Sequence, residues 1–140
     1  MREVSLLGPR GHVFRAESPQ TRRERMRGWR GRSTVGPDDA LLLDRTRSIH
    51  TFGMRFPISA VLLDRELVVR SVRPVRPGRV VLPRPGTRHV IECAEGVDLR
   101  PGDRLRIVPG PTEGRAGGGY TSRRCPRAGG GVRHDRAPIV

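Results

Sequence analysis

The sequence has no lysine and no asparagine, few aromatic residues, two cysteines and no long hydrophobic run. Nothing approaches the ~20 apolar residues that a membrane-spanning helix needs, so we expect no membrane partner. The run Val4–Leu7 is also shorter than the roughly 7–15 apolar residues of a signal-peptide core. Cys93 and Cys125 are too far apart in the sequence to form a metal knuckle. Reduced thiols are usual in the cytoplasm, which is the location we expect.

The missing lysine makes the charge unusual, because all 28 basic residues are arginine and only 14 residues are acidic. A formal net charge of +14 is typical of proteins that bind nucleic acid or another polyanion. Exclusive use of arginine equally fits a GC-rich codon bias. The excess is also spread out, at +6 over residues 1–37, +4 over 38–110 and +4 over 111–140. Composition alone therefore does not separate polyanion binding from a generally basic surface.

Short apolar runs separated by turn residues predict a mainly-β fold. Residues 3–7 and 12–16 flank a glycine- and proline-containing turn and predict a β-hairpin. The continuous run Ala40–Leu43 predicts a strand that is buried on both faces. The other predicted strands are Ile58–Leu63, Leu67–Val72, Val80–Leu82, His89–Cys93 and Leu105–Val108. About seven to eight short strands indicate a compact β-sandwich or barrel.

One short N-terminal helix is predicted between these strands. Thr21 and Glu24 have the spacing of a capping box, in which each side chain bonds the backbone amide of the other residue. Met26 and Trp29 are three residues apart, so we expect them to form a narrow apolar face that docks on the core. The glycines at 28 and 31 favour an early end after two to three turns.

The composition changes from Gly110 onward to glycine, arginine and proline, with glycine triplets at 117–119 and 129–131. Such a segment cannot bury enough apolar surface to offset its ordering entropy. We therefore predict a single mainly-β domain over residues 1–110 and a disordered tail over 111–140.

The densest group of distinctive side chains is Ser48–Ile58, which reads Ser-Ile-His-Thr-Phe-Gly-Met-Arg-Phe-Pro-Ile. It resembles the Ile-His-Thr-Phe-Gly-Met-Arg-Phe-Pro-Ile signature of the prokaryotic family called domain of unknown function 192. The preceding run Arg25–Arg32 resembles that family's Arg-x-x-Gly-Leu-Leu-Gly-Arg signature. Weaker matches lie at Val90–Glu92 and Leu99–Leu105. The resemblance covers about residues 15–108, and it implies a compact mainly-β domain but no particular reaction.

The chain departs from the family pattern at two places. Trp29 and Arg30 stand where the family usually has two aliphatic residues or Leu-Met, and Ser59 stands where it often has aspartate. A neutral hydroxyl at 59 cannot serve as the general base that an aspartate would provide. These departures leave the resemblance informative about the fold and weaken any argument for catalysis.

Periodicity suggests that much of this motif is core. If residues 49–58 are extended, His50, Phe52 and Met54 share one face with the apolar residues at 56 and 58. On this interpretation His50 is a buried histidine beside packed aromatic rings. Gly53 would alternatively mark a bulge that reverses the faces beyond it.

A functional interpretation of the same motif uses His50 and Arg55. The guanidinium fork of Arg55 suits a carboxylate or phosphate. Glu92 is an unusual acid for a strand interior, and Arg55 is a candidate partner for it. We therefore favour a small non-catalytic binding or accessory module for a small anionic ligand, with His50, Arg55 and Glu92 as site residues. An enzyme of unknown class that uses His50 and Arg55 is the alternative.

A metal or cofactor is not expected. His50, His89, Glu92 and Cys93 have suitable ligand atoms. On one strand, however, His89 and Cys93 would lie about 13 Å apart, with Glu92 on the opposite face.

Polyanion binding through the basic helix region and the tail is a third hypothesis, with nucleic acid as the partner. Arginine-rich segments bind phosphates in many nucleic-acid-binding proteins. The candidate residues are Arg22, Arg23, Arg25, Arg27, Arg30 and Arg32.

Overall fold

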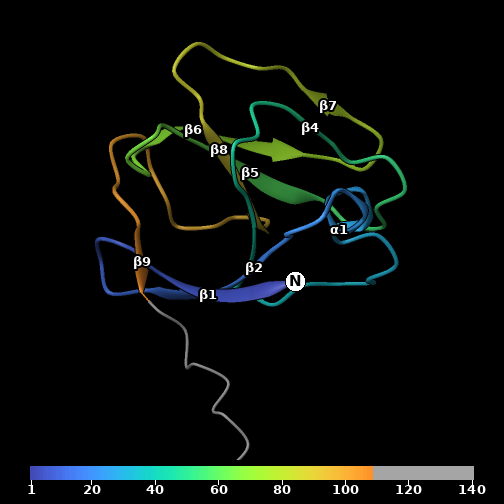
Figure 1. Ribbon diagram of the computed structural model, residues 1–140, viewed down its shortest axis with the longest axis horizontal. Helices are drawn as coiled ribbons and strands as arrows, with labels where there is room; N and C mark the ends of the chain where they lie inside the picture. Colours follow the sequence, from blue (N-terminus) through green and yellow to red (C-terminus); the bar gives the residue numbers. More distant parts are fainter. Residues whose placement is uncertain (109–140) are drawn as a thin grey trace, which may run out of the picture.

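The computed structural model describes residues 1–108, and these residues form a mainly-β domain with one short helix (Figure 1). The elements within this range are β1 Arg2–Leu7, β2 Val13–Ser18, α1 Arg22–Arg27, β3 Asp39–Leu43, β4 Ile49–His50, β5 Ile58–Leu63, β6 Val69–Val75, β7 Val80–Val81, β8 His89–Ala94 and β9 Arg106–Val108. The predicted fold class is confirmed. The predicted boundary at residue 110 and the tail 111–140 lie outside the described residues.

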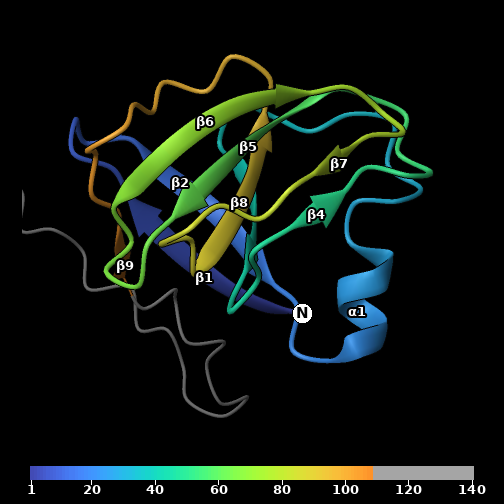
Figure 2. The same cartoon turned by 90° about the horizontal axis from the view of Figure 1, so that it is seen from above.

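Seven of the strands form one large sheet, in the order β6-β5-β8-β3-β2-β1-β9, and β4 pairs with β7 in a small second sheet. Neighbouring strands are antiparallel except for β2 and β3. The two edges of the large sheet meet, because Val68 and Arg104 form a β-bridge and the Val69 amide donates to the Asp103 carbonyl at 2.7 Å. The sheet therefore curves round towards closure, as in a small barrel (Figures 1 and 2).

The central strands β3, β5 and β8 are buried on both faces. Alternate side chains enter two separate hydrophobic clusters, so that Ala40 and Leu42 pack inside the curved sheet while Leu41 and Leu43 pack on its outer face. The buried strand predicted at Ala40–Leu43 is confirmed. Residues from the connection after α1 and from β4 and β7 complete the outer cluster. The outer face of the sheet is thus covered by short, irregular segments, and the cavity described below lies there.

The hairpin predicted from residues 3–7 and 12–16 forms, and a second hairpin joins β5 and β6. β1 pairs with β2 from Arg2 opposite Ser18 to Leu7 opposite Val13. In the second turn the Asp64 carboxylate accepts from the amides of Glu66 and Val68 at 2.8 and 3.0 Å. These bonds explain why an aspartate stands at this turn.

The capping box predicted for α1 is present. The Glu24 amide donates to the Thr21 hydroxyl at 3.1 Å, and the Thr21 amide donates to the Glu24 carboxylate at 3.3 Å. The predicted apolar face is wrong, because the helix ends at Gly28 and Trp29 leaves the helical path. Trp29 is buried at 1% exposure, whereas Met26 is 65% exposed. Within residues 1–108 no helix is long and apolar enough to cross a membrane.

The predicted extended conformation of residues 49–58 is also wrong. Between β4 and the start of β5 at Ile58 the chain is not a strand, and the Met54 amide donates to the Thr51 carbonyl at 3.2 Å to close a turn. Thr51 is fully buried, while Phe52 is 47% exposed and His50 is exposed, so the core packing expected of these two rings does not occur. Met54 is buried as predicted. The positive φ of Gly53, 78°, belongs to this turn and not to a bulge in a continuous strand.

Candidate functional site

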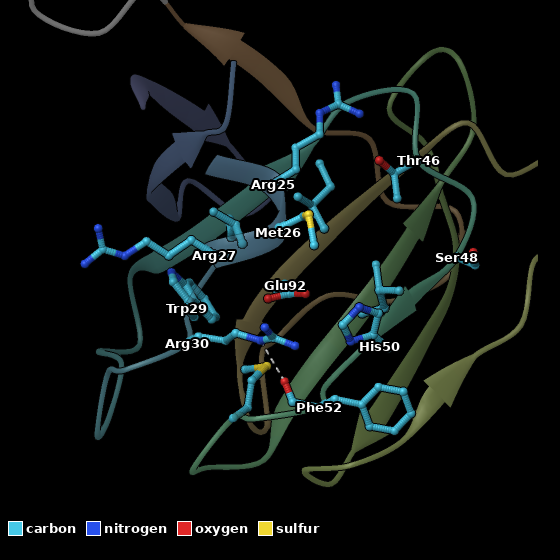
Figure 3. A pocket seen from close by; sticks show the side chains of 15 residues that line it. Arg25, Met26, Arg27, Trp29, Arg30, Thr46, Ser48, His50, Phe52 and Glu92 are labelled. Carbon is cyan, nitrogen blue, oxygen red and sulfur yellow. Dashed lines mark hydrogen bonds between the residues drawn. The ribbon is translucent and has the colours of Figure 1, made fainter. Parts of the chain in front are cut away.

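A cavity of about 240 Å³ lies on the outer face of the large sheet, between α1 with its following turn and the motif that contains His50 (Figure 3). The strands β3 and β8 form its floor, and the segment from Thr46 to Met54 forms one wall. The opposite wall consists of α1 and Trp29. Segments far apart in the sequence therefore build one concave surface.

Glu92 is the acidic residue on the cavity floor. It lies in the middle of β8, paired with Leu41 of β3 on one side and Ala60 of β5 on the other. The residue is 5% exposed and lines the cavity, and within residues 1–108 its carboxyl has no hydrogen-bond or ion-pair partner. Burial raises the pKa of the Glu92 carboxyl to about 7, because an apolar environment disfavours the charged form. Figure 3 shows this carboxyl between Trp29 and His50.

The rim of the cavity carries positive charge. Arg25, Arg27 and Arg30 all line it, and all three side chains belong to exposed residues. Arg30 also spans the cavity edge, because its Nε donates to the Phe52 carbonyl at 3.0 Å (Figure 3). This bond joins the turn after α1 to the turn after β4.

Gly53 makes that contact sterically feasible. A Cβ atom at this position would lie 3.3 Å from Arg30 Nε, and the backbone φ of 78° is one that residues with side chains rarely adopt. Two structural features therefore favour glycine at position 53: the positive φ of the turn and the close approach of the Arg30 side chain.

Two aromatic contacts complete the walls. The His50 and Phe52 rings stack with centroids 5.0 Å apart, and both residues line the cavity. Trp29 packs against Phe56 with centroids 6.2 Å apart. The Trp29 indole N–H is buried and has no acceptor within the described part of the chain. Two residues that line the cavity, Trp29 with its indole N–H and Glu92 with its carboxyl, therefore have polar groups without a partner among residues 1–108.

The structure brings together only part of the predicted site. His50 and Glu92 line the same cavity, but Arg55 is exposed and lies outside it. An ion pair between Arg55 and Glu92 is absent from residues 1–108. The enzyme hypothesis required His50, Arg55 and Glu92 to converge on one cleft, and these three residues do not.

The predicted helix arginines have different surroundings. Arg32 donates to Glu17 at 2.6 Å and Arg30 is held by Phe52, so both are already engaged. The side chains of Arg22, Arg23, Arg25 and Arg27 are exposed, and within residues 1–108 they have no hydrogen-bond partner. Sequence reasoning did not single out Arg30 as a cavity residue. The only signal for it was that Trp29 and Arg30 replace the expected aliphatic pair.

Cys93 and the histidines do not add a nucleophile or a metal centre to this cavity. Burial and the neighbouring Glu92 charge raise the pKa of the Cys93 thiol to about 12. Cys93 packs in the inner cluster, on the other face of β8 from Glu92. In the part of the chain that the structure describes, no three residues of the types His, Cys, Asp or Glu are grouped to hold a metal ion.

The fold and this site define a small mainly-β domain with a covered outer sheet face. The chain belongs to the family domain of unknown function 192, described as "Uncharacterized ACR", whose model matches residues 5–107. The predicted family is confirmed, and the match begins earlier than the expected residue 15.

Two solved structures are similar to the chain. One is a protein of unknown function from Novosphingobium aromaticivorans, with a TM-score of 0.64 and 21% identity, covering 74% of this chain and 83% of that one. The other is a protein from Sinorhizobium meliloti described as a "putative transcription regulator", with a TM-score of 0.62 and 22% identity, covering 75% and 92%. At this identity the likeness concerns the fold alone. No curated protein matches the chain, and none of these comparisons indicates a specific function.

Proposed function

We propose that the protein is a non-catalytic binding module and that the cavity between α1 and β4 binds a small organic anion. The observation that carries this proposal is the carboxyl of Glu92 on the cavity floor, which has no partner among residues 1–108. Burying a polar group without a hydrogen-bond partner costs free energy, typically about 1–3 kcal/mol. A ligand group that bonds to Glu92 recovers part of that cost, so the ligand-free protein is prepared to bind.

The lining of the cavity supports a ligand with two different ends. Arg25, Arg27 and Arg30 line the cavity and favour an anionic group, since guanidinium forks suit carboxylates and phosphates. Figure 3 shows the guanidinium group of Arg30 nearest to Glu92 and those of Arg25 and Arg27 directed outward. Leu41 and Leu43 on the floor and Met54 on one wall provide apolar surface. A volume of about 240 Å³ is slightly below the usual ~300–1,000 Å³ of small-molecule pockets, which favours a compact metabolite.

Glu92 adds a pH dependence to this proposal. Because burial raises its pKa to about 7, the carboxyl is mostly neutral in mildly acidic solution and can then donate its proton to an anionic or carbonyl oxygen. Above that pKa the negative charge on the floor repels an anion. Binding of the anion should therefore strengthen as the pH falls from 8 towards 6.

The test is a thermal-shift screen of the full chain with acetate, lactate, succinate and glycerol phosphate. A binding anion should raise the Tm by about 4–8 °C for each kcal/mol of stabilisation. Glu92→Leu removes the floor carboxyl and should abolish the response, and Arg27→Gln removes rim charge and should weaken it.

Arg55→Gln is the matched control, because Arg55 is an exposed arginine of the Ser48–Ile58 motif that lies outside the cavity. It should respond like the wild type. The proposal fails if no anion stabilises the wild type, or if Arg55→Gln loses the response while Arg27→Gln keeps it. The latter result would favour the pair His50 and Arg55 as the ligand site.

Polyanion binding through the helix region is a second candidate, supported by the exposed side chains of Arg22, Arg23, Arg25 and Arg27. Electrophoretic shifts of nucleic acid over a salt series would test it. Phosphate binding of this kind weakens steeply as salt rises.

We also propose a cytoplasmic location, because Cys93 is a free, buried thiol and unpaired cysteine is usual in reducing compartments. Cell fractionation with an antibody to the protein would test this.

A further inference from the structure

A second concave surface lies at one end of the sheet and is lined by arginines. The turn after β3, the β5–β6 turn and the loop before β8 surround an open groove of about 1030 Å³. Figure 2 shows the β5–β6 turn and the connection from β7 to β8 near one another. The arginines that line the groove are Arg45, Arg47, Arg65, Arg70, Arg84 and Arg88. The groove and the Glu92 cavity share no lining residue.

These six guanidinium groups are available to a ligand. Within residues 1–108 none of them donates a side-chain hydrogen bond or forms an ion pair. Two of the three acids in the groove are already occupied. The Asp64 carboxylate holds the β5–β6 turn, and Asp44 Oδ1 lies 2.6 Å from His89 Nδ1. Six arginines against three acids give the groove a net positive charge, which residues 1–108 leave unbalanced.

Hydrogen bonds hold the loops that present these arginines. The Thr87 amide donates to the Arg84 carbonyl at 3.1 Å across Pro85 and Gly86, and the φ of Gly86 is 83°. Proline followed by a glycine of positive φ is the pattern of a type II turn. The Arg88 amide donates to the Leu63 carbonyl at 2.8 Å, which ties the loop to the end of β5. Arg84 and Arg88 are thus positioned on either side of a constrained turn.

Arg70 adds a third element to the same wall. A Cβ atom at Gly86 would lie 3.4 Å from a terminal nitrogen of the Arg70 guanidinium. The guanidinium therefore rests against the turn, and the side chain reaches from β6 to the loop before β8. Charge from two separate segments converges on one surface.

We propose that this groove binds a small anion that carries several phosphate groups. Arginine forks bind phosphate oxygens in pairs, and several forks round one groove suit several closely spaced phosphates. Apart from the imidazole of His89, the lining contains no aromatic ring on which a base could stack. Single-stranded nucleic acid is usually bound by stacking on aromatic side chains, so the groove is better suited to phosphates than to bases.

Isothermal titration of the full chain with tripolyphosphate tests this proposal. The double variant Arg84→Gln/Arg88→Gln should weaken binding at least about tenfold, since hydrogen bonds between charged groups are the strong ones. Arg104→Gln/Arg106→Gln is the matched control, because it removes the same charge from exposed arginines outside the groove. The control should change the affinity less than about twofold. Both double variants alter exposed side chains, and their Tm without ligand checks that they fold.

Two results would overturn the proposal, and a third separates the groove from the Glu92 cavity. Equal weakening by the two double variants would overturn the proposal in favour of unspecific attraction to net charge. Tighter binding of a single-stranded RNA than of tripolyphosphate, lost in Arg84→Gln/Arg88→Gln, would overturn the small-ligand assignment. Glu92→Leu should leave tripolyphosphate binding unchanged, so that failure of the Glu92 cavity as a site and failure of the groove are distinguished.

Discussion

Gly53 is the residue at which the two walls of the Glu92 cavity meet. The turn that contains it offers the Phe52 carbonyl to Arg30, and a Cβ at position 53 would lie 3.3 Å from Arg30 Nε, so that Arg30 would have to shift by a few tenths of an ångström. One exposed arginine thereby holds together two segments that are separated by 22 residues in the sequence.

Replacing Gly53 by alanine should therefore lower the free energy of unfolding by more than the left-handed backbone conformation alone accounts for. Gly96→Ala is the control, because Gly96 has a φ of 76° but no atom within 4 Å of the place that a Cβ would occupy. Each substitution should cost about 1–2 kcal/mol for the left-handed backbone. Gly53→Ala should lose roughly 0.5–1.5 kcal/mol more, the value of a hydrogen bond. Urea unfolding measures both, and equal losses would show that the Arg30 contact contributes nothing.

Other residues of the site illustrate what the sequence alone could predict. Glu92 was recognisable because an acid is unusual in a strand interior. The orientation of His50 and Phe52 was not, because alternation fails where a two-residue strand runs into a turn. Arg30 was missed as a cavity residue because its partner is remote in the sequence. Local patterns identified the unusual side chains, and tertiary contacts decided which of them meet.

At the scale of elements, α1 is short for an independent helix. Six residues are too few for stability in isolation, so α1 depends on its cap and on the burial of Trp29 beyond its end. Arg25 and Arg27 on this helix line the cavity rim. The capping box therefore influences the site as well as the fold.

Thr21→Ala removes the cap, and it should lower the free energy of unfolding by about 1 kcal/mol. Thr21→Ser keeps a hydroxyl and serves as the control. Hydrogen exchange should show faster exchange of the α1 amides in Thr21→Ala than in Thr21→Ser. If the two variants have the same stability and exchange, the cap seen in the structure does not stabilise the helix.

The strands were largely predictable, but their order was not. Runs such as Ile58–Leu63 have local signals, and the hairpins follow from short turns between neighbouring runs. The placement of β8 between β5 and β3, and the parallel pairing of β2 with β3, join segments that are distant in the sequence. Nothing in composition or periodicity specifies such pairings. This order is what puts Glu92 between Leu41 and Ala60, on a face that the outer segments cover.

At the scale of the whole molecule, the net charge is +14, and several of the arginines lie together on two concave surfaces. Three arginines surround the Glu92 cavity, and six others line the groove at the end of the sheet. The loop after β3 contributes residues to both surfaces, with Arg45 and Arg47 in the groove and Thr46 and Ser48 in the cavity. The two proposed anion sites together contain nine of the 22 arginines in residues 1–108.

Glu92 is a buried carboxyl without a partner among residues 1–108, and its burial makes the stability of the whole molecule depend on pH. Its pKa is about 7 in the folded protein and 4.5 in its ordinary state. Below pH 4.5 the carboxyl is neutral in both states and costs no charge burial. Between pH 4.5 and 7 the unfolded chain ionises this group while the folded protein keeps it neutral, so the free energy of unfolding falls by about 3 kcal/mol over this range and changes little above it.

The most direct test compares urea unfolding of wild type and Glu92→Gln at pH 5 and pH 8. The amide cannot ionise, so the variant lacks this contribution, while the other titrating groups are common to both proteins. We expect the wild type to lose about 2–3 kcal/mol relative to Glu92→Gln between these pH values. Parallel pH profiles for the two proteins would contradict the claim, because they would show that Glu92 is solvated or already has a partner.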